Sequence, residues 1–371
     1  MDFAVSETGS GSEDLTLLYD QYNGLRRRHA GFLGYPVNLA IDYRAFGELL
    51  DTLWITVGDP STGYQPRLGL QPFEREVVRF LAKLSGARPD HTYGYVTSGG
   101  TEANLYGIHL GRQRLPEAPL YFGATAHYTV ERTALLLRME PVRIPCRRDG
   151  SIDPVALRAA CVRRRGRGAV VVATVGTTVH GAIDSLPEVL DAIGPAGRHH
   201  LHVDAALGGL VAAFAPSPPP WGFDAGADSV AISGHKLIGA PVPCGVVLAR
   251  EELVGSPAEV DYLSAADSTL SCSRSGLSVA FLWYALRQLG RSGLAARVHR
   301  CLETADYAVR ALSRTGHRPW RHPASLTVLF ERPPASVCRR WRLATSGNLA
   351  HLVAMPHVTR DMIDRFCRDL G

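Results

Sequence analysis

The amino-acid sequence predicts an α/β protein with a doubly wound, mainly parallel sheet, followed by a small C-terminal α+β part. From about residue 92, short runs of β-branched and apolar residues alternate with segments of helical spacing. Glycine or proline bounds these runs. Continuous apolar strands separated by helices are typical of parallel sheets that are covered on both faces. With 371 residues, of which 46% are apolar, the chain is long enough to bury such a core.

The N-terminal part predicts few regular elements. The polar, acidic residues 1–14 predict a tail, and residues 15–30 predict a helix. The aromatic-rich chain that follows, up to residue 64, predicts an irregular arm lying over another part of the protein. In residues 72–84, apolar side chains recur at helical spacing between a proline and a glycine, so we expect a helix there.

The central part of the chain predicts the strands of the sheet. The segments are TYGYVTS, PLYFGA, GAVVVATV, HHLHVDAA, ADSVAIS and CGVVLAR. Helices are expected over 101–113 and 127–138, after the first two strands. The C-terminal part predicts a long helix (278–311), a strand (325–330), a helix (334–344), the strand LAHLVAM and a final helix. This order predicts an N-terminal tail and arm (1–60), a large domain (61–290) and a small C-terminal domain (291–371).

Composition and charge exclude several classes of protein. The net charge is only +5, and the arginine clusters at 26–28 and 163–165 lack the interleaved aromatic residues of a nucleic-acid platform. No apolar run reaches the roughly 18–20 residues of a membrane span, and the acidic start does not fit a signal peptide. Seven cysteines without a CxxC pair argue against a disulfide framework and a zinc site. We expect a cytoplasmic protein that binds no metal, nucleic acid or membrane.

Lysine is rare in this chain. Of the 40 basic residues only two are lysines, Lys83 and Lys236. A neutral lysine amine can form a Schiff base, whereas an arginine stays protonated. Lys83 lies in the last turn of the helix predicted over 72–84, where a cation suits the helix dipole. Lys236 is therefore the candidate for a covalent anchor.

Three segments place polar groups where predicted strands end. Ser98-Gly99-Gly100-Thr101-Glu102 joins a strand to a helix, where backbone N–H groups can hold a phosphate. An ordinary tight turn with Thr101 as the N-cap is the alternative. Asp204 ends one strand and Lys236 follows the next, so both are expected at the same edge of the sheet. For these two residues the alternative is a buried pair that only supports the scaffold.

Together these groups match what pyridoxal phosphate requires. The cofactor needs a phosphate cradle, a carboxylate that keeps its pyridine nitrogen protonated and a lysine for a Schiff base. The protonated ring then accepts the electron pair of a carbanion at the α carbon of the substrate. His127 follows the strand PLYFGA, so its flat ring is expected to stack on the cofactor, although a lone histidine is more often a bystander.

Six motifs support this interpretation; they lie in order between Tyr95 and Pro356, within a resemblance to a known family that extends from about Tyr19 to the C-terminus. They are YVTSGGTEAN, AHYTV, VGTTVHGAID, HVDAALGGL, SGHKLIGAPVPCG and LATSGNLAHLVAMP. These motifs resemble those of the pyridoxal-phosphate-dependent group II amino-acid decarboxylases, in the branch of the bacterial histidine decarboxylases and the plant serine decarboxylases. The resemblance implies an aspartate-aminotransferase-type fold (fold type I) and an obligate homodimer with active sites at the subunit interface.

The resemblance also implies catalytic roles for three residues. Lys236 is expected to bind the cofactor covalently, and His127 is expected to stack on its ring and to contact the substrate. Tyr262 stands at the position of the tyrosine that the family carries on a mobile loop as a proton donor. Amine is therefore the product that the resemblance implies.

Further residues are implied to hold the cofactor. Asp204 is expected to pair with the pyridine nitrogen, and Ala206 is expected to pack on the face of the ring opposite His127. Thr177 is expected near the hydroxyl side of the ring. The residues expected around the phosphate are Gly99, Gly100, Thr101, Ser233 and His235.

One segment departs from the family pattern. The family usually has Ser-Arg-Asn-Gly-His after the mobile loop, whereas this chain has Ser273-Arg274-Ser275-Gly276-Leu277. The segment is expected to reach the neighbouring active site, so the change bears on the choice of substrate. We expect an α-decarboxylase that acts on histidine or on another small polar amino acid such as serine. A decarboxylating aldehyde synthase or aminotransferase on the same fold, and a cofactor-free binding protein, are the alternatives.

Overall fold

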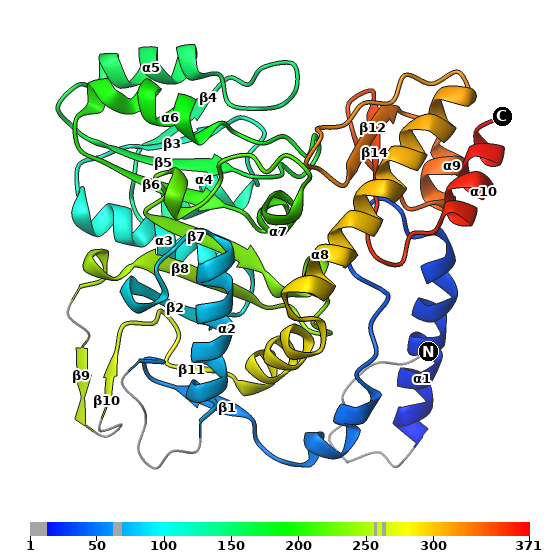
Figure 1. Cartoon of the computed structure of the whole chain (residues 1–371), viewed down its shortest axis with the longest axis horizontal. Coiled ribbons are helices and arrows are strands. Elements are labelled where there is room, and N and C mark those ends of the chain that lie inside the picture. Colours follow the sequence, from blue (N-terminus) through cyan, green and yellow to red (C-terminus); the bar gives the residue numbers. More distant parts are fainter. Residues whose placement is uncertain (1–12, 62–68, 256–257, 262–264) are drawn as a thin grey trace.

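The structure is a computed structural model of the chain, and it describes residues 13–61, 69–255, 258–261 and 265–371. A seven-stranded sheet forms the centre of one lobe, and a three-stranded sheet lies in a second, smaller lobe (Figure 1). A long helix, α8 (Gly276–Arg314), runs between the two lobes (Figure 1). Within the described ranges, no helix is long and apolar enough to cross a membrane.

The large sheet has the strand order β2-β8-β7-β6-β5-β3-β4. The strands from β4 to β7 in this order run parallel, and β8 is antiparallel to both of its neighbours. The strands are β2 (Thr92–Thr97), β3 (Leu120–Gly123), β4 (Pro141–Ile144), β5 (Ala169–Thr174), β6 (His199–Asp204), β7 (Ser229–Ser233) and β8 (Gly245–Arg250). The predicted mainly parallel sheet is therefore confirmed.

Strand β4 is the member of the large sheet that the sequence did not predict. It is only four residues long, it lies at the sheet edge, and its side chains alternate between exposed and buried. By contrast, all residues of β5 are buried. An edge strand of this kind has no continuous apolar run, which was the signal used for the other six strands.

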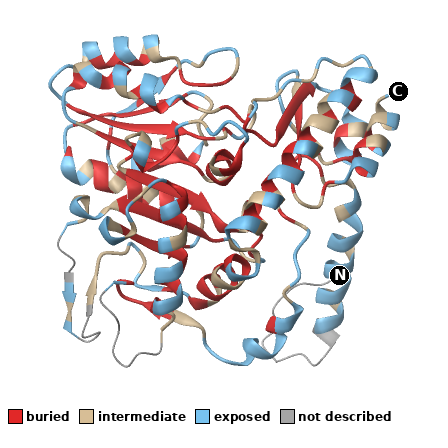
Figure 2. Cartoon of the chain, in the orientation of Figure 1, coloured by how far each residue is buried: buried red, intermediate tan, exposed pale blue. Residues whose placement is uncertain are grey.

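Helices cover both faces of the large sheet, and its strands are buried between them (Figure 2). Val170 and Val172 of β5 belong to a core cluster with residues of α3 (Gly100–Arg114) and α4 (Thr129–Leu136). Val171 and Ala173 point to the opposite face, since successive side chains of a strand alternate. Helices that contribute to this second core include α2 (Gln71–Leu84), α5 (Pro154–Arg163), α6 (Leu186–Ile193), α7 (Gly208–Phe214) and α8.

The smaller lobe combines the C-terminal part with the N-terminal arm. Its antiparallel strands follow the order β12-β14-β13, and the elements are β12 (Thr327–Glu331), α9 (Ala335–Arg340), β13 (Ala344–Ser346), β14 (Leu349–Val353) and α10 (Arg360–Leu370). The carbonyl oxygen of Leu33 accepts a hydrogen bond from the Val353 N–H at 2.7 Å, so the arm joins this sheet. Helix α8 is interrupted at Gly290, where φ is 58° and ψ is −174°. We propose this break as the boundary between the large and the small domain.

The N-terminal arm is more regular than predicted. After helix α1 (Glu13–Arg28), it contains a 3-10 helix (Arg44–Asp51) and strand β1 (Ile55–Val57). Strand β1 pairs in antiparallel fashion with β11 (Ser273–Ser275). Two more short strands, β9 (Ala258–Val260) and β10 (Ala265–Asp267), pair with each other in the segment before β11.

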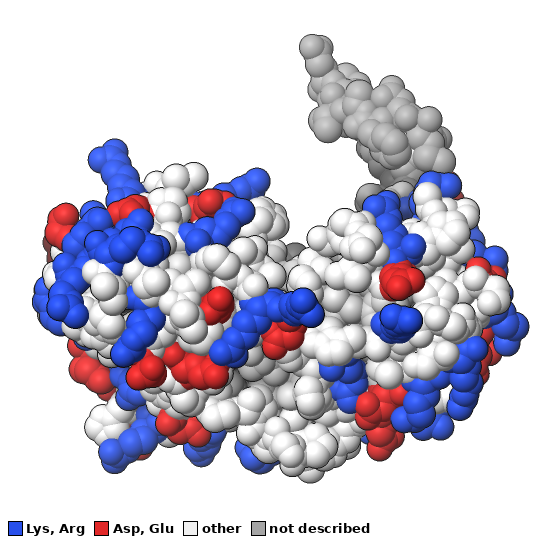
Figure 3. Space-filling view, turned by 90° about the horizontal axis from the view of Figure 1, so that it is seen from above, with Lys and Arg blue, Asp and Glu red and all other residues white. Residues whose placement is uncertain are grey.

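The surface carries charges of both signs. Figure 3 shows basic and acidic side chains beside one another on the upper face of the molecule. Glu140, for example, forms ion pairs with Arg164 at 2.8 Å and with Arg167 at 2.6 Å. The arginine cluster at 163–165 is thus partly neutralised at the exposed end of helix α5.

Candidate active site

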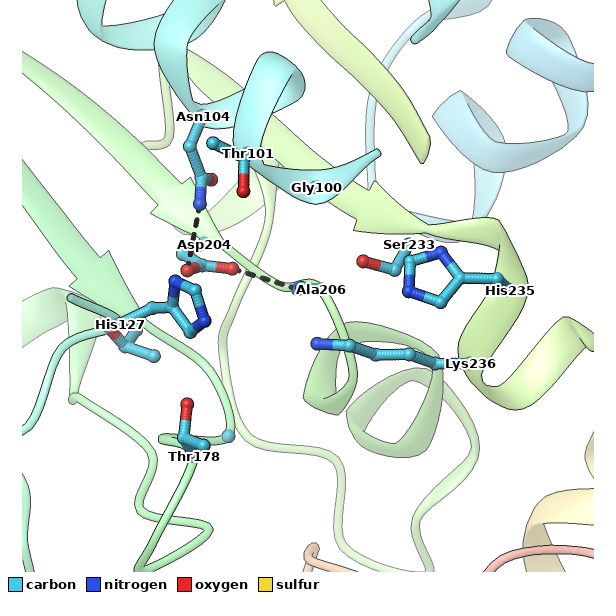
Figure 4. Close-up of a pocket in the computed structure, with 12 residues that line it drawn as sticks. Gly100, Thr101, Asn104, His127, Thr178, Asp204, Ala206, Ser233, His235 and Lys236 are labelled. Atoms are coloured by element: carbon cyan, nitrogen blue, oxygen red, sulfur yellow. Dashed lines mark hydrogen bonds between the residues drawn. The ribbon is translucent and has the colours of Figure 1, made fainter. Parts of the chain in front are cut away.

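The predicted site residues lie at the edge of the large sheet where its parallel strands end. Strand β6 ends at Asp204, and β7 ends at Ser233 just before the turn that carries Lys236. Strand β2 runs in the same direction as β7, because β8 lies between them and is antiparallel to both. The Gly-rich turn after β2 therefore reaches the same edge. The described residues that line a cavity there are Gly100, Thr101, Asn104, His127, Thr174, Gly176, Thr178, Asp204, Ala206, Ser233, His235 and Lys236 (Figure 4).

Lys236 sits in a short turn, Gly234–Ile238, that is held from two sides. Its own backbone is non-helical, with φ −81° and ψ −107°. The carbonyl oxygen of Leu237 accepts hydrogen bonds from Asn38 and from Arg297, both at 3.2 Å. The side chain extends into the cavity (Figure 4). Burial lowers the pKa of Lys236, and the nearby carboxylate of Asp204 raises it by a smaller amount. A lowered pKa favours the neutral amine, which is the nucleophilic form.

Asp204 is the one carboxylate among the described residues that line the cavity. Its side chain is 5% exposed and receives two hydrogen bonds. Asn104 donates through Nδ2 to Oδ2 at 3.0 Å, and the Ala206 N–H donates to Oδ1 at 3.2 Å (Figure 4). An ionised carboxylate accepts about four hydrogen bonds, so Asp204 keeps capacity for a donor on a bound molecule.

The start of helix α3 forms a site for an anion. Gly100 begins this helix, and a Cβ atom there would lie 2.7 Å from Ser233 Oγ, so a larger residue would force the Ser233 hydroxyl to move. The hydroxyls of Thr101 and Ser233 and the imidazole of His235 line the same end of the cavity. Backbone N–H groups at a helix N-terminus favour bound phosphate. This arrangement fits the predicted phosphate cradle.

His127 lies between strand β3 and helix α4, with its ring in the cavity (Figure 4). Its Nδ1 is 2.7 Å from Thr129 Oγ1. Burial lowers the pKa of His127, with a smaller opposing effect from Asp204 and a further lowering by Lys236. The neutral imidazole is therefore favoured, and the contact to Thr129 fixes the direction of the ring.

The structure brings together most of the residues that the sequence singled out. Eight line the cavity: Gly100, Thr101, His127, Asp204, Ala206, Ser233, His235 and Lys236. Gly99 precedes the helix and does not line it, and Tyr262 lies outside the described residues. Lys83, by contrast, is exposed in the last turn of α2.

Thr177 follows strand β5 but does not line the cavity. Its side chain is buried, and its Oγ1 accepts a hydrogen bond from the Ala182 N–H at 3.0 Å. The hydroxyl thus stabilises its own loop, and the next residue, Thr178, lines the cavity instead. The sequence Gly176-Thr177-Thr178 contains two adjacent threonines, so the motif alone did not distinguish them.

Four lining residues were missed: Asn104, Thr174, Gly176 and Thr178. Asn104 had a usable signal, because it lies one helical turn after Gly100 in α3 and so shares its face. Thr174 is the last residue of a strand that the sequence predicts, where ligand contacts are common. The other two follow it in the same loop.

Comparisons with known proteins agree with this geometry. The family model described as "Pyridoxal-dependent decarboxylase conserved domain" matches residues 71–319. The chain belongs to this family. A histidine decarboxylase of Vibrio campbellii is 35% identical over 351 residues, covering 93% of this chain and 91% of that protein. Serine decarboxylase 1 of Oryza sativa subsp. japonica is 36% identical over 383 residues, covering 99% and 79%. The predicted relationship to group II decarboxylases is confirmed.

Solved structures confirm the fold of this decarboxylase. An L-methionine decarboxylase from Streptomyces sp. 590 superposes with a TM-score of 0.88 at 23% identity, covering 99% of this chain and 97% of that one. Glutamate decarboxylase from Lactobacillus brevis superposes with a TM-score of 0.81 at 18% identity, covering 100% and 93%. The chain has the fold type I architecture, and it is a pyridoxal-phosphate-dependent amino-acid decarboxylase.

The residues of the cavity fit pyridoxal phosphate. A buried amine, a carboxylate with spare acceptor capacity and a glycine-dependent anion site surround one space. When bound, the cofactor accepts the electron pair left behind as the substrate loses CO2. What the protein adds is the position and the protonation state of the groups around it.

The loop after β5 depends on a buried carboxylate, Asp184. Its two oxygens accept hydrogen bonds from the N–H groups of Ile152 and Thr174, both at 2.7 Å. Burial raises the pKa of Asp184 from 3.8 to about 6, and these two hydrogen bonds oppose the shift. Asp184 thereby ties the loop to Thr174, a residue that lines the cavity.

We expect Asp184 to make stability depend on pH. The folded state keeps the proton up to about pH 6, whereas the unfolded chain releases it near pH 4. The contribution of Asp184 to the free energy of unfolding should therefore fall as pH rises between these values, by at most about 3 kcal/mol. Asp184→Asn should lower the free energy of unfolding by ~1–3 kcal/mol relative to the unmodified protein, because one N–H is left without an acceptor.

Urea unfolding of both proteins, at several pH values from about 4.5 to about 7.5, measures how the free energy of unfolding depends on pH. The advantage of the unmodified protein over Asp184→Asn should shrink toward the higher pH. An advantage that grows with pH would show that the pKa of Asp184 is lowered rather than raised.

Proposed function

We propose that this decarboxylase acts on histidine or on another compact polar amino acid such as serine, with aromatic amino acids disfavoured. Bacterial histidine decarboxylases are 34% to 37% identical to the chain, and rice serine decarboxylases are 34% to 36% identical. Similarity therefore favours neither substrate. The observation that carries the assignment of the site is the convergence of Lys236, Asp204 and His127 on one cavity (Figure 4).

The roles of these three residues follow from their surroundings. Lys236 binds the cofactor covalently, because burial favours its neutral amine. Asp204 holds a proton at the pyridine nitrogen, for which its remaining acceptor capacity is suited. His127 stacks its neutral ring on the cofactor and contacts the substrate, and Ala206 packs on the opposite face.

The remaining contacts belong to the phosphate and to the ring hydroxyl. Gly99, Gly100, Thr101, Ser233 and His235 surround the phosphate in this proposal. For the hydroxyl side of the ring we propose Thr178 in place of Thr177, since the Thr178 side chain lines the cavity. Tyr262 remains the proposed proton donor on the family resemblance alone.

We also propose a cytoplasmic homodimer with its active sites at the subunit interface. One face of helix α1 carries apolar residues at helical spacing that are 48% to 67% exposed: Leu15, Leu18, Tyr19, Tyr22 and Leu25. A helix with such a stripe is stable in water when the stripe is covered. A second copy of the chain is the partner that covers it in this proposal.

The segment that departs from the family pattern lies apart from the Lys236 cavity. Ser275 caps helix α8 by accepting a hydrogen bond from the Ser278 N–H at 3.3 Å. Ser275 and Leu277 line a separate cavity together with residues such as Val242 and Pro243. In the proposed dimer, this segment contributes to the active site of the second subunit. It can then affect specificity although it lies apart from the Lys236 cavity of its own subunit.

Restoring the usual family residues should change the preference between substrates. In Ser275→Asn/Leu277→His, asparagine still caps the helix, and Leu277 is only partly buried, so the fold should be retained. We expect the ratio of kcat/KM for histidine to that for serine to shift. An equal change for all amino acids tested would show that the segment does not determine specificity.

A panel of amino acids tests the proposed substrate class directly. The purified protein is incubated with histidine, serine, methionine, glutamate, phenylalanine, tyrosine and tryptophan, and kcat/KM for CO2 release is compared. Histidine or serine should have the highest value. A preference for phenylalanine, tyrosine, tryptophan or glutamate would contradict the proposal.

A further inference from the structure

A row of buried polar side chains extends from Asp204 into the core of the large domain. His200, His202 and Asp204 occupy alternate positions of β6, so they share one face of the sheet. Both histidines are fully buried, as is Ser229 on the neighbouring strand β7. Buried polar groups are costly unless they are hydrogen-bonded. These groups therefore need partners, and the structure provides them to one another.

The contacts form one continuous chain. In order from the active site, Asn104 Nδ2 lies 3.0 Å from Asp204 Oδ2, His202 Nε2 lies 2.9 Å from Asn104 Oδ1, His202 Nδ1 lies 2.8 Å from Ser229 Oγ, His200 Nε2 lies 3.1 Å from Ser229 Oγ, and Arg114 Nη1 lies 3.5 Å from His200 Nδ1. Asn104 and Arg114 belong to helix α3, and the other members belong to β6 and β7. This hydrogen-bond chain thus connects the cavity with the C-terminal end of α3.

Helix α3 is shaped to admit the two imidazoles. A Cβ atom on Gly107 would lie 2.1 Å from His202 Nδ1, and a Cβ atom on Gly111 would lie 2.9 Å from the His200 ring. These glycines lie four residues apart, so they share one face of the helix. Side chains at these positions would displace the histidines, which indicates that the helix and the imidazoles are packed as a unit.

The two ends of this hydrogen-bond chain, Asp204 and Arg114, fix the direction of its hydrogen bonds. An ionised Asp204 can only accept, so the Asn104 amide must turn its NH₂ group toward Asp204 and its oxygen toward His202. His202 then donates from Nε2 and accepts at Nδ1 from the Ser229 hydroxyl. His200 in turn donates from Nε2 to Ser229 and accepts at Nδ1 from Arg114, which can only donate. Every hydrogen bond points toward Asp204.

We infer that Asn104, His202, Ser229 and His200 form a one-directional hydrogen-bond chain that orients the carboxylate of Asp204 toward the cavity. His202 is then a positioning residue for the carboxylate rather than part of a passive core. This inference rests on the role proposed for Asp204 at the pyridine nitrogen.

The charge state of the two histidines agrees with this direction. Burial lowers the pKa of His202 to about 3, with a smaller lowering by His200. Burial also lowers the pKa of His200 to about 4; Asp228 and a backbone hydrogen bond with Gly107 oppose this shift, and Arg114 and His199 add to it. Both imidazoles are therefore neutral at ordinary pH and each can donate from one nitrogen only, as the chain requires.

The tautomers of the histidines test the chain without reference to catalysis. Protein labelled with ¹⁵N-histidine and loaded with cofactor is measured by long-range ¹H–¹⁵N NMR, with signals assigned from the variants His200→Leu and His202→Leu. Both residues should be neutral and protonated at Nε2. A proton on Nδ1 of His202 would reverse the chain and overturn the inference, whatever the role of Asp204.

Variants then test the effect on Asp204. His202→Leu removes the donor to Asn104, whereas His202→Gln places an amide near the position of Nε2 and can restore it. His199→Leu is the matched control, because His199 lies on β6 but points to the other face. Reconstitution with ¹⁵N-labelled pyridoxal phosphate reports whether the ring nitrogen is protonated.

We expect His202→Leu to lose the ring-nitrogen proton at a lower pH than the unmodified protein and to reduce kcat/KM by about 2- to 10-fold, as for the loss of one hydrogen bond between neutral groups. His202→Gln should recover most of both effects, and His199→Leu should show neither. Ser229→Ala should shift the nitrogen signal in the same direction as His202→Leu. If His202→Leu and Ser229→Ala leave the ring-nitrogen signal unchanged, the chain does not act on Asp204.

Discussion

Replacement of Lys236 by alanine is expected to abolish the covalent binding of pyridoxal phosphate and the yellow colour of the protein. Lys236 is the one lysine among the described residues that line the cavity. Burial lowers its pKa and so favours the amine that forms the Schiff base. Turnover should fall below detection, because the substrate has no activated cofactor to react with. Absorbance spectra, and mass spectrometry after borohydride reduction, measure the loss.

Lys83→Ala is the matched control for this change. Lys83 is the other lysine of the chain, and it is exposed at the end of helix α2. Its replacement should leave the colour, the covalent adduct and the activity unchanged. A covalent adduct that persists in Lys236→Ala would overturn the assignment of the anchor.

Asp204→Ala should reduce kcat strongly while the protein still folds. Without the carboxylate, none of the described residues that line the cavity is an acid that can hold a proton at the pyridine nitrogen. The expected loss is about 10²–10³-fold, which is typical when one preorganised electrostatic group is removed. Stability should change less, because Asp204 lies at the end of β6, next to the cavity, rather than among apolar side chains. Measurements of kcat and of thermal unfolding separate the two effects.

Asp204→Asn refines this test. The amide has nearly the same shape, and its oxygen can still accept from the Ala206 N–H, but it carries no negative charge. Its kcat should be almost as low as that of Asp204→Ala, whereas its unfolding temperature should be closer to that of the unmodified protein. Near-normal turnover in either variant would contradict the role of Asp204 as the partner of the ring nitrogen.

The sequence was sufficient for the main sheet because its central strands are buried on both faces. Strands such as β5 are apolar at nearly every position, and this pattern is visible without a structure. Helices α6 and α7 were not predicted, since with only eight and seven residues they span about two turns each. The pairing of β1 with β11 joins residues more than two hundred positions apart, and local patterns contain no information on such a contact.

In the site, too, features of local sequence were predictable, whereas contacts between distant segments were not. Asp204 and Lys236 were predictable because each follows a recognisable strand and has a chemical function that few residues share. The hydrogen-bond chain behind Asp204 was not predicted, although both histidines stand in the strand HHLHVDAA. Their partners Asn104 and Ser229 come from other elements, so the chain becomes visible only when α3, β6 and β7 are packed together.

The products of the reaction test the central claim most directly. Purified protein loaded with pyridoxal phosphate is incubated with histidine and with serine in air, and CO2, amine, aldehyde and hydrogen peroxide are quantified together. The account predicts that CO2 and amine are formed in equal amounts, with little aldehyde or peroxide. Aldehyde as the main product, with peroxide formed alongside it, would instead assign the protein to the decarboxylating aldehyde synthases. No CO2 release from these two amino acids or from any other member of the substrate panel would contradict a decarboxylase altogether.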